Sequence, residues 1–126
     1  MARGNSGIKP TEAELTLLNV LWKLGPATVR QVHDNVSQTQ KTGYTTVLKI
    51  LQIMHEKTLV IRDESNRAHI YAPANSEGFT QSSLLKDLIS KAFGGSTSKL
   101  VMRALGDSTS SEEIADIRQL LNELEK

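Results

Sequence analysis

Apolar residues recur through most of the chain at the spacing of amphipathic α-helices, and short polar segments separate these stretches. The segment 43–60 shows the pattern most clearly, because at about 3.6 residues per turn its apolar and polar positions fall on opposite sides of one helix. The apolar side consists of Val47, Ile50, Leu51 and Met54. The polar side consists of Thr45, Lys49, Gln52 and Glu56, with Thr46 at its flank. We therefore predict a helix that buries the first face and exposes the second.

Two further helices are expected before this one, and each begins with a capping box of the form Ser/Thr-x-x-Glu/Gln. Thr11-Glu-Ala-Glu14 starts the first helix. It should end near Gly25-Pro26, because glycine favours the left-handed C-terminal position and proline cannot continue the helical hydrogen bonding. Thr28-Val-Arg-Gln31 starts the second helix, and the polar segment 37–43 connects it to the third. The apolar face of the second helix carries Val29, Val32 and Val36.

A two-stranded hairpin is expected directly after the third helix. Residues 59–64 and 67–72 are strand-like, and Ser65-Asn66 supplies a turn at which asparagine tolerates positive φ. Three helices followed by a hairpin are the order of a winged helix, in which the third helix fits the major groove of DNA.

The hairpin carries two arginines, Arg62 and Arg67, on either side of its turn. Exposed guanidinium groups on a projecting hairpin can bind phosphates in a bidentate manner or enter the minor groove. Alternatively, either arginine pairs with the neighbouring Asp63 or Glu64. The pattern of the third helix has an equally simple alternative, which is an amphipathic helix with a solvated polar face.

Three more helices are expected in residues 75–126. The first has a broad apolar face and is interrupted at Gly94-Gly95. Ser96 can cap the next helix, and the last one follows Ser110 or Ser111. The apolar residues of the last helix are spaced three, four and three apart, which is typical of a seam between packed helices. They are Ile114, Ile117, Leu121 and Leu124.

Three short helices of about 50 residues enclose too little volume to bury these apolar faces by themselves. We predict that they pack against a second copy of the chain, because a two-fold axis presents the same patch from both copies. The same axis places two recognition helices for successive major grooves. The alternative is that they fold back on the N-terminal domain of their own chain. The candidate dimerisation residues are Leu88, Phe93, Leu100, Val101, Ile114, Ile117, Leu121 and Leu124.

The charge distribution differs between the two halves of the chain. Residues 1–74 carry nine Lys/Arg and six Asp/Glu, whereas residues 75–126 carry six and eight, so the net charges are +3 and −2. A modestly basic first half fits contact with phosphates, although +3 alone is too small to indicate it. The predicted fold class is therefore mainly α with a small β-hairpin wing. We expect residues 1–74 to form a winged helix-turn-helix DNA-binding domain and residues 75–126 to form a helical dimerisation region.

The composition argues against several function classes. The chain has no cysteine, no apolar run of about 20 residues and no apolar N-terminal signal segment, so we expect a cytoplasmic protein without membrane insertion or thiol chemistry. His33, His55 and His69 form no short ligand motif, so no metal and no other cofactor is expected. We expect His33 and His69 to be partly buried hydrogen-bonding residues. The sequence has no Gly-x-Ser-x-Gly element, P-loop or dinucleotide fingerprint, so an enzyme is not expected.

Seven short stretches, spread over nearly the whole chain, carry a resemblance to a known family: Thr11-Glu-Ala-Glu-Leu15, Leu21-Trp22, Gly25-Pro-Ala-Thr-Val-Arg-Gln-Val-His33, Tyr44-Thr-Thr-Val-Leu-Lys49, Arg67-Ala-His-Ile-Tyr-Ala-Pro73, Phe93-Gly-Gly-Ser96 and Leu100-Val-Met102. In this order they resemble the penicillinase-repressor family of bacterial winged-helix regulators. The resemblance implies a homodimeric repressor that binds a palindromic operator through its N-terminal domain and dimerises through C-terminal helices. Such repressors answer to β-lactam antibiotics or, in a copper-responsive branch, to metal, but the C-terminal cysteine cluster of that branch is absent here.

The resemblance also implies how repression ends. In the antibiotic-responsive relatives, a membrane-bound metalloprotease sensor, or a pathway that it starts, leads to cleavage in the fifth-helix region before a phenylalanine. The matching stretch here is Leu100-Val-Met-Arg-Ala-Leu105, in which Arg103-Ala104 replaces the usual Asn-Phe type of bond. We hypothesise that a protease of different specificity still cuts near residues 100–105 after an antibiotic or cell-envelope signal. The cut would separate the seam from the DNA-binding half.

The candidate DNA-binding residues lie at the start of the second helix, in the connection, on the third helix and beside the hairpin turn. They are Thr28, Arg30, Lys41, Tyr44, Thr45, Thr46, Lys49, Arg62 and Arg67. We expect them to bind an operator in double-stranded DNA. The alternative is a winged-helix module that binds a protein partner with the same surface, because a fold does not dictate its function. Salt dependence distinguishes the two, since phosphate contacts release counterions.

Overall fold

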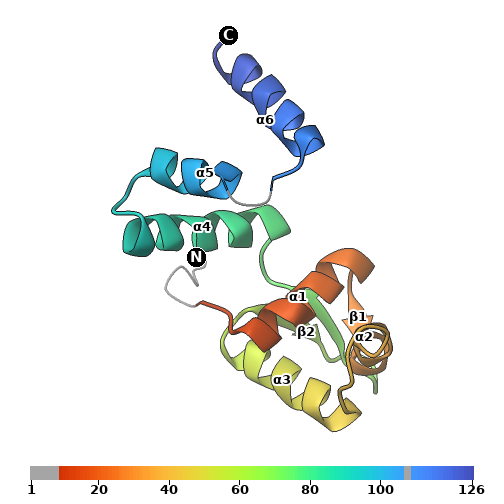
Figure 1. Ribbon diagram of the computed structural model, residues 1–126. Coiled ribbons are helices and arrows are strands. Elements are labelled where there is room, and N and C mark those ends of the chain that lie inside the picture. Colours follow the sequence, from red (N-terminus) through yellow and green to blue (C-terminus); the bar gives the residue numbers. More distant parts are fainter. Residues whose placement is uncertain (1–8, 107–108) are drawn as a thin grey trace. The chain divides into compact units, whose positions relative to one another are not determined.

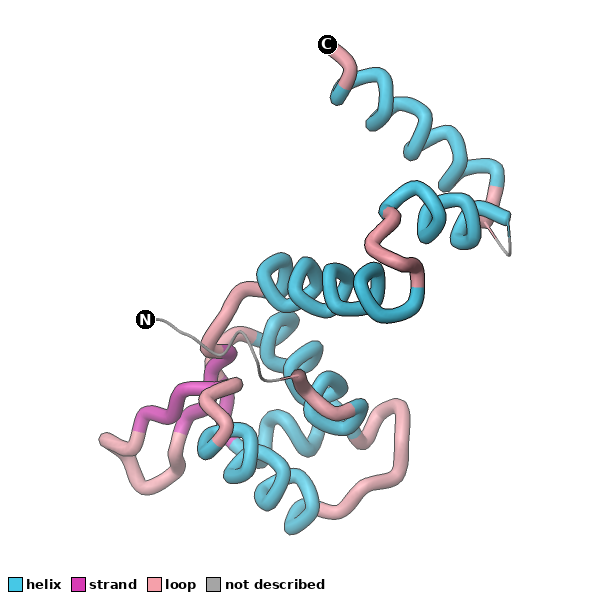
Figure 2. The backbone as a smooth tube through the Cα atoms, turned by 90° about the vertical axis from the view of Figure 1, so that its left-hand side faces the viewer, coloured by secondary structure: helices cyan, strands magenta, loops and turns pink. Residues whose placement is uncertain are grey.

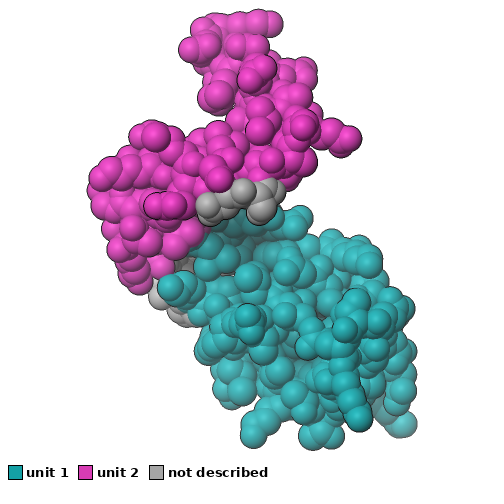
Figure 3. All heavy atoms as spheres, in the orientation of Figure 1, with its two compact units in different colours: residues 1–84 teal, residues 85–126 magenta. Residues whose placement is uncertain are grey.

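The computed structural model describes residues 9–106 and 109–126, which contain six α-helices and three short β-strands (Figure 1). In chain order these are α1 (Glu12–Leu24), β1 (Ala27–Thr28), α2 (Val29–Val36), α3 (Tyr44–Glu56), β2 (Val60–Asp63), β3 (Ile70–Pro73), α4 (Glu77–Ala92), α5 (Thr97–Gly106) and α6 (Ser111–Leu124). The chain divides into two compact units, residues 1–84 and residues 85–126 (Figure 3), and the division falls within α4. The predicted domain boundary between residues 74 and 75 lies before that helix and stays a prediction.

Helices α1 and α2 begin at the two predicted capping boxes. The Thr11 hydroxyl accepts a hydrogen bond from Glu14 N (3.2 Å), and the Glu14 carboxylate accepts one from Thr11 N (2.9 Å). Thr28 and Gln31 make the same reciprocal pair at 3.2 and 2.9 Å. Gly25, with a φ of 83°, ends α1 and donates its N–H to a carbonyl of the last turn (2.8 Å). Each of these signals involves near neighbours in the chain, so the sequence predicts them well.

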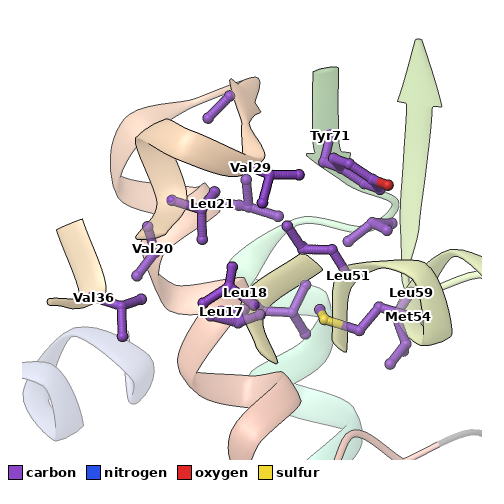
Figure 4. Packing of buried hydrophobic residues seen from close by; sticks show 14 residues of the cluster. Leu17, Leu18, Val20, Leu21, Val29, Val36, Leu51, Met54, Leu59 and Tyr71 are labelled. Carbon is purple, nitrogen blue, oxygen red and sulfur yellow. The ribbon is translucent and has the colours of Figure 1, made fainter. Parts of the chain in front are cut away.

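The hydrophobic core of the first unit lies between α1, α2, α3 and the strands (Figure 4). Tyr71 of β3 belongs to this core, and only 1% of its surface is exposed. Full burial of a large apolar side chain contributes about 1.5–3 kcal/mol, so this cluster holds the helices together. Ile50, which was expected on the buried face of α3, is only partly buried because it packs at the edge of the core. The fully buried side chains of the helices include Leu21, Val32, Leu51 and Met54.

The sheet has three strands: the predicted hairpin of β2 and β3, and a third strand, β1, which the sequence did not predict. Its order is β1-β3-β2, and both pairings are antiparallel. Ala27 of β1 pairs with Tyr71, and Arg62 of β2 pairs with the same residue from the other side. Two residues between the end of one helix and the start of another are too few to show an alternating pattern, so β1 left no signal in the sequence.

The wing is the hairpin formed by β2 and β3, and its loop is longer than predicted. Because β3 begins at Ile70, three residues later than expected, residues 64–69 form the connection (Figure 2). Asp63 Oδ1 accepts hydrogen bonds from the backbone N (2.9 Å) and the hydroxyl (2.7 Å) of Ser65. This side-chain turn competes with continued strand pairing. Asn66 is not among the described residues with positive φ, so this turn does not use the tolerance of asparagine for that conformation.

The end of α4 and the starts of α5 and α6 lie at the predicted glycines and serines. Gly94 and Gly95 have φ values of 57° and 82°, and Gly95 donates its N–H to a carbonyl of the last turn of α4 (2.9 Å). Ser96 accepts a hydrogen bond from the first turn of α5 (3.1 Å). Of the two serines considered for α6, Ser110 is the cap and Ser111 is the first helical residue. None of the described residues of α4, α5 and α6 is buried.

Candidate DNA interface

The exposed face of α3 is determined by the residues that the same helix buries. Val47, Leu51 and Met54 are at most 1% exposed, and they hold α3 in the core formed with α1 and α2. Hydroxyl, amide and ammonium groups on the opposite face can donate to base edges or to phosphate oxygens. All five polar residues predicted for this face are exposed: Thr45, Thr46, Lys49, Gln52 and Glu56.

The first residues of α3 contact α2, and the N-cap Gly43 makes no side-chain capping hydrogen bond. His33 Nε2 lies 2.9 Å from the carbonyl oxygen of Thr42. The Tyr44 and His33 rings meet edge to face with centroids 5.9 Å apart, and the Arg30 guanidinium carbon lies 5.5 Å from the centre of the Tyr44 ring. Arg30 and Tyr44, both predicted to contact DNA, are therefore exposed neighbours.

Thr28 and Lys41 have different surroundings from the residues of α3. The Thr28 hydroxyl accepts the Gln31 N–H that starts α2, and the residue is half-buried. Thr28 therefore has a structural role, and a DNA contact by it stays a prediction. Lys41 is exposed in the connection between α2 and α3, where its ammonium is a point charge suited to a phosphate.

The two arginines of the wing differ in their partners. Arg62 donates to Glu64 Oε2 through Nε (2.7 Å) and pairs with it through Nη2 (2.6 Å), and its side chain is 21% exposed. A hydrogen bond with Tyr71, and then the Glu64 carboxylate, raise the pKa of Arg62. Arg67 is exposed in the wing loop. The pairing that we considered as an alternative for both arginines is thus present for Arg62, and Arg67 is the better placed of the two for a phosphate.

An ion pair that the sequence did not predict connects the start of α1 to the end of α3. Lys57 Nζ lies 3.1 and 2.9 Å from the two carboxylate oxygens of Glu14, which is 3% exposed. Burial raises the pKa of the Glu14 carboxyl, but hydrogen bonds from Thr11 and Lys57 and the charge of Lys57 outweigh it, so the pKa is lowered. The two partners are 43 residues apart in the chain, so their pairing has no local sequence pattern. The sequence indicated only the capping role of Glu14.

The histidines do not form part of a metal site in the part of the chain that the structure describes. There, no group of three or more His, Asp or Glu side chains could hold a metal ion. His33 and His69 are half-buried, as predicted, and His33 makes the expected hydrogen bond. Within residues 9–106 and 109–126, no helix is both long enough and apolar enough to span a bilayer.

The residues predicted for dimerisation and cleavage lie on the C-terminal helices, except Phe93, which directly follows the end of α4. Arg103 and Ala104 are exposed within α5. Their cleavage, and the dimer itself, stay predictions at this point. The exposed dimerisation residues are Leu88 (48%), Val101 (38%), Ile114 (39%), Leu121 (54%) and Leu124 (71%), and the half-buried ones are Phe93, Leu100 and Ile117.

Known proteins with similar sequences cover almost the whole chain. A family model described as the penicillinase repressor matches residues 10–123. The chain is 30% identical over 115 residues to the transcriptional regulator BlaI of Mycobacterium tuberculosis, which covers 90% of this chain and 83% of that protein. It is 20% identical to the penicillinase repressor of Staphylococcus aureus, over 97% of this chain and 98% of that protein.

Among solved structures, a MarR family protein from Bacillus stearothermophilus superposes with a TM-score of 0.55. The sequence identity is 16%, and the match covers 95% of this chain and 76% of that one. At this identity the likeness concerns the fold alone. Together with the family match, it confirms the predicted fold class of a mainly helical winged helix with a small sheet.

Proposed function

The chain belongs to the penicillinase repressor family, and we propose that it is a transcriptional repressor that binds an operator in double-stranded DNA. The observation that carries the proposal is the exposed polar face of α3, which is held outward by a buried opposite face. Lys41 before α3 and Arg67 in the wing loop add positive charge to the same unit. The excess of nine Lys/Arg over six Asp/Glu in residues 1–74 also agrees with a partner that carries phosphates. Operator binding implies that the protein acts in the cytoplasm.

Two copies of the chain would bind a palindromic operator in this proposal. The support comes from α4, α5 and α6: none of their described residues is buried within one chain, and the apolar Leu88, Leu121 and Leu124 are 48, 54 and 71% exposed. A second copy would cover the same apolar faces in both chains because of the two-fold symmetry. It would also present two α3 helices to half-sites about 34 Å apart, which is one turn of DNA.

Derepression would follow from proteolysis within α5. Arg103 and Ala104 are exposed, and a cut between them would separate α6 from the DNA-binding unit. In the dimer, binding of one DNA-binding unit raises the effective concentration of the other at the second half-site. Units separated by cleavage lose this gain in affinity, so the operator would be released. The upstream component would be a membrane-bound metalloprotease sensor pathway that responds to an antibiotic or a cell-envelope signal. A chain that stays full length in cells while its target genes are induced would refute this part of the proposal.

The test is a selection of bound duplexes from a random DNA pool at two salt concentrations. We expect a two-fold symmetric motif that is enriched at low salt and lost at high salt, because phosphate contacts release counterions. Enrichment of a motif without two-fold symmetry would refute the binding of two copies to a palindromic operator, but it would still support DNA binding. No enrichment at either concentration would refute the repressor and favour a winged helix that binds a protein partner.

A further inference from the structure

The recognition helix α3 lacks the local device that begins three other helices of the protein. Helices α1, α2 and α6 each start at a capping box, whereas the N-cap of α3 is Gly43, which makes no side-chain hydrogen bond. The first N–H groups of a helix have no partner within the helix, so its first turn frays unless another contact fixes it. In this structure, the side-chain contacts at the start of α3 come from α2.

His33 of α2 provides the hydrogen bond that holds this segment. Its Nε2 lies 2.9 Å from the carbonyl oxygen of Thr42, and since a carbonyl can only accept, this nitrogen carries the proton. The hydroxyl of Ser37 lies 3.2 Å from the same nitrogen. Thr42 immediately precedes the N-cap Gly43, so the bond fixes the peptide from which α3 begins. The His33 side chain is 23% exposed, which leaves the bond partly shielded from competing water.

The first residue of α3 is held by two side chains of α2. The Tyr44 ring meets the His33 ring at 74° with centroids 5.9 Å apart, and the Arg30 guanidinium carbon lies 5.5 Å from its centre. Arg30 and His33 are three residues apart and therefore lie on one face of α2. One face of α2 thus contacts both Thr42 and Tyr44, on either side of the uncapped N-cap.

We propose that His33 is a positioning residue for sequence-specific DNA binding: it fixes residues 42–44 so that Thr45 and Thr46 meet base edges in one register. This inference rests on the proposed function. Hydrogen bonds to bases need donor–acceptor distances of about 2.7–3.2 Å, so a small movement of the first turn of α3 breaks them. The buried core residues of α2 and α3 carry the fold, whereas partly exposed His33 controls only where α3 begins.

The experiment compares His33→Ala, His33→Phe and His33→Gln in the full-length protein. Phenylalanine keeps a ring beside Tyr44 but loses the hydrogen bond, and glutamine keeps an N–H donor but loses the ring. The measurement is the ratio of dissociation constants for the selected operator and for a duplex with one changed base pair per half-site. Thermal unfolding of each variant is followed in parallel. Gln38→Ala, an exposed change in the same connection, is the matched control.

We expect the alanine and phenylalanine variants to lose about tenfold in the operator ratio, which corresponds to one lost base contact, while their affinity for unrelated DNA stays within about twofold. The glutamine variant should recover most of the ratio, and the control should match the wild type. If the phenylalanine variant keeps the wild-type ratio of dissociation constants, the inference is overturned. This result is decisive even if the alanine variant does not fold. If the wild-type protein binds all duplexes equally well, the proposed function fails, and the inference fails with it.

Discussion

Individual side chains divide into those available to a partner and those already engaged in the fold. Thr46 and Lys49 are exposed on α3, whereas Arg62 is engaged by Glu64 on the wing. In the sequence, Arg62 and Arg67 flank a turn, Arg67 is the stronger candidate for a DNA contact, and pairing with Asp63 or Glu64 is open to either arginine. The structure separates them, because β2 brings Arg62 opposite Tyr71 and leaves Arg67 in the loop.

Replacing base-contacting residues should change sequence preference, whereas replacing phosphate-contacting residues should not. We expect Thr46→Ala and Lys49→Ala to relax the preference at one operator position each, by about 1–3 kcal/mol. Lys41→Ala and Arg62→Ala should weaken binding to all operator variants alike or leave it unchanged. Binding measured across a set of single-base operator variants tests this prediction. Uniform weakening by all four substitutions would contradict the assignment.

The Glu14–Lys57 ion pair predicts a pH-dependent stability. Because the pKa of Glu14 is lowered in the folded state, its stabilising contribution is complete above the ordinary value of 4.5 and is lost as the pH falls through the folded value. Glu14→Gln should lower the free energy of unfolding by about 2 kcal/mol at pH 7. This difference in unfolding free energy between variant and wild type should shrink below about pH 4.5. Urea unfolding from pH 7 to pH 3 measures both quantities.

A matched control for this prediction is Glu12→Gln in the same first turn of α1, because Glu12 is exposed. Its stability should stay close to wild type at neutral pH. Comparing each variant with wild type at each pH removes the contributions of other carboxylates such as Asp63 and Glu64, whose pKa values are also lowered. If the difference in unfolding free energy between Glu14→Gln and wild type stays constant down to pH 3, the ion pair contributes nothing to stability.

Helices differ in how much of their boundary is encoded locally. The starts of α1, α2 and α6 are marked by capping boxes, and the ends of α1 and α4 by glycines with positive φ. Helix α3, which carries the candidate DNA-binding face, begins after a glycine without a capping side chain. The element closest to the proposed function is thus the one whose start depends most on its neighbours.

This difference predicts that α3 can be stabilised by a new cap. Gly43 has a φ of −85° and a ψ of 154°, which any residue can adopt, and a Cβ atom there would meet Thr46 Oγ1 at an ordinary 3.9 Å. Gly43→Ser adds an acceptor for a first-turn N–H and should raise stability by about 0.5 kcal/mol, or the melting temperature by about 2–4 °C. Gly43→Ala, which offers no acceptor, is the control. An equal gain in both variants would show that capping is not the cause.

For the complete chain, the contrast between the two units matters most. The first unit has a closed core, whereas the helices α4, α5 and α6 bury none of their described residues. Small helical assemblies with exposed apolar faces are marginal alone and commonly find a partner. The stability and the DNA affinity of the protein should therefore both depend on its concentration, through the proposed dimer.

Charges placed in the apolar seam of α6 should separate the two copies. Leu121→Glu and Leu124→Glu replace side chains that are 54 and 71% exposed within one chain, and in the dimer they would bring carboxylates into an apolar interface. We expect monomers in light scattering at micromolar concentration and a loss of operator affinity of about 100-fold or more. Gln119→Glu, which adds the same charge outside the seam, should stay dimeric. Intact dimers in both seam variants would contradict the interface.

Much of the architecture was predictable because its signals are local. Capping boxes, glycine stops and the 3.6-residue period of α3 depend on residues within a few positions of one another, and they predicted the order of the helices and the exposed face of α3. The family resemblance then extended these elements to a function, and the family match agrees with it.

The remaining features depend on residues that are distant in the chain and that only folding brings together. Pairing of β1 with β3, the Glu14–Lys57 ion pair and the engagement of Arg62 by Tyr71 leave no periodic pattern. The contacts of His33 with Thr42 and Tyr44 belong to the same class. In such a contact, the fold determines which groups lie close together, and a side chain forms its hydrogen bonds with the group that lies nearby. Local sequence thus specified which surface faces outward, and tertiary packing decided how firmly that surface is held.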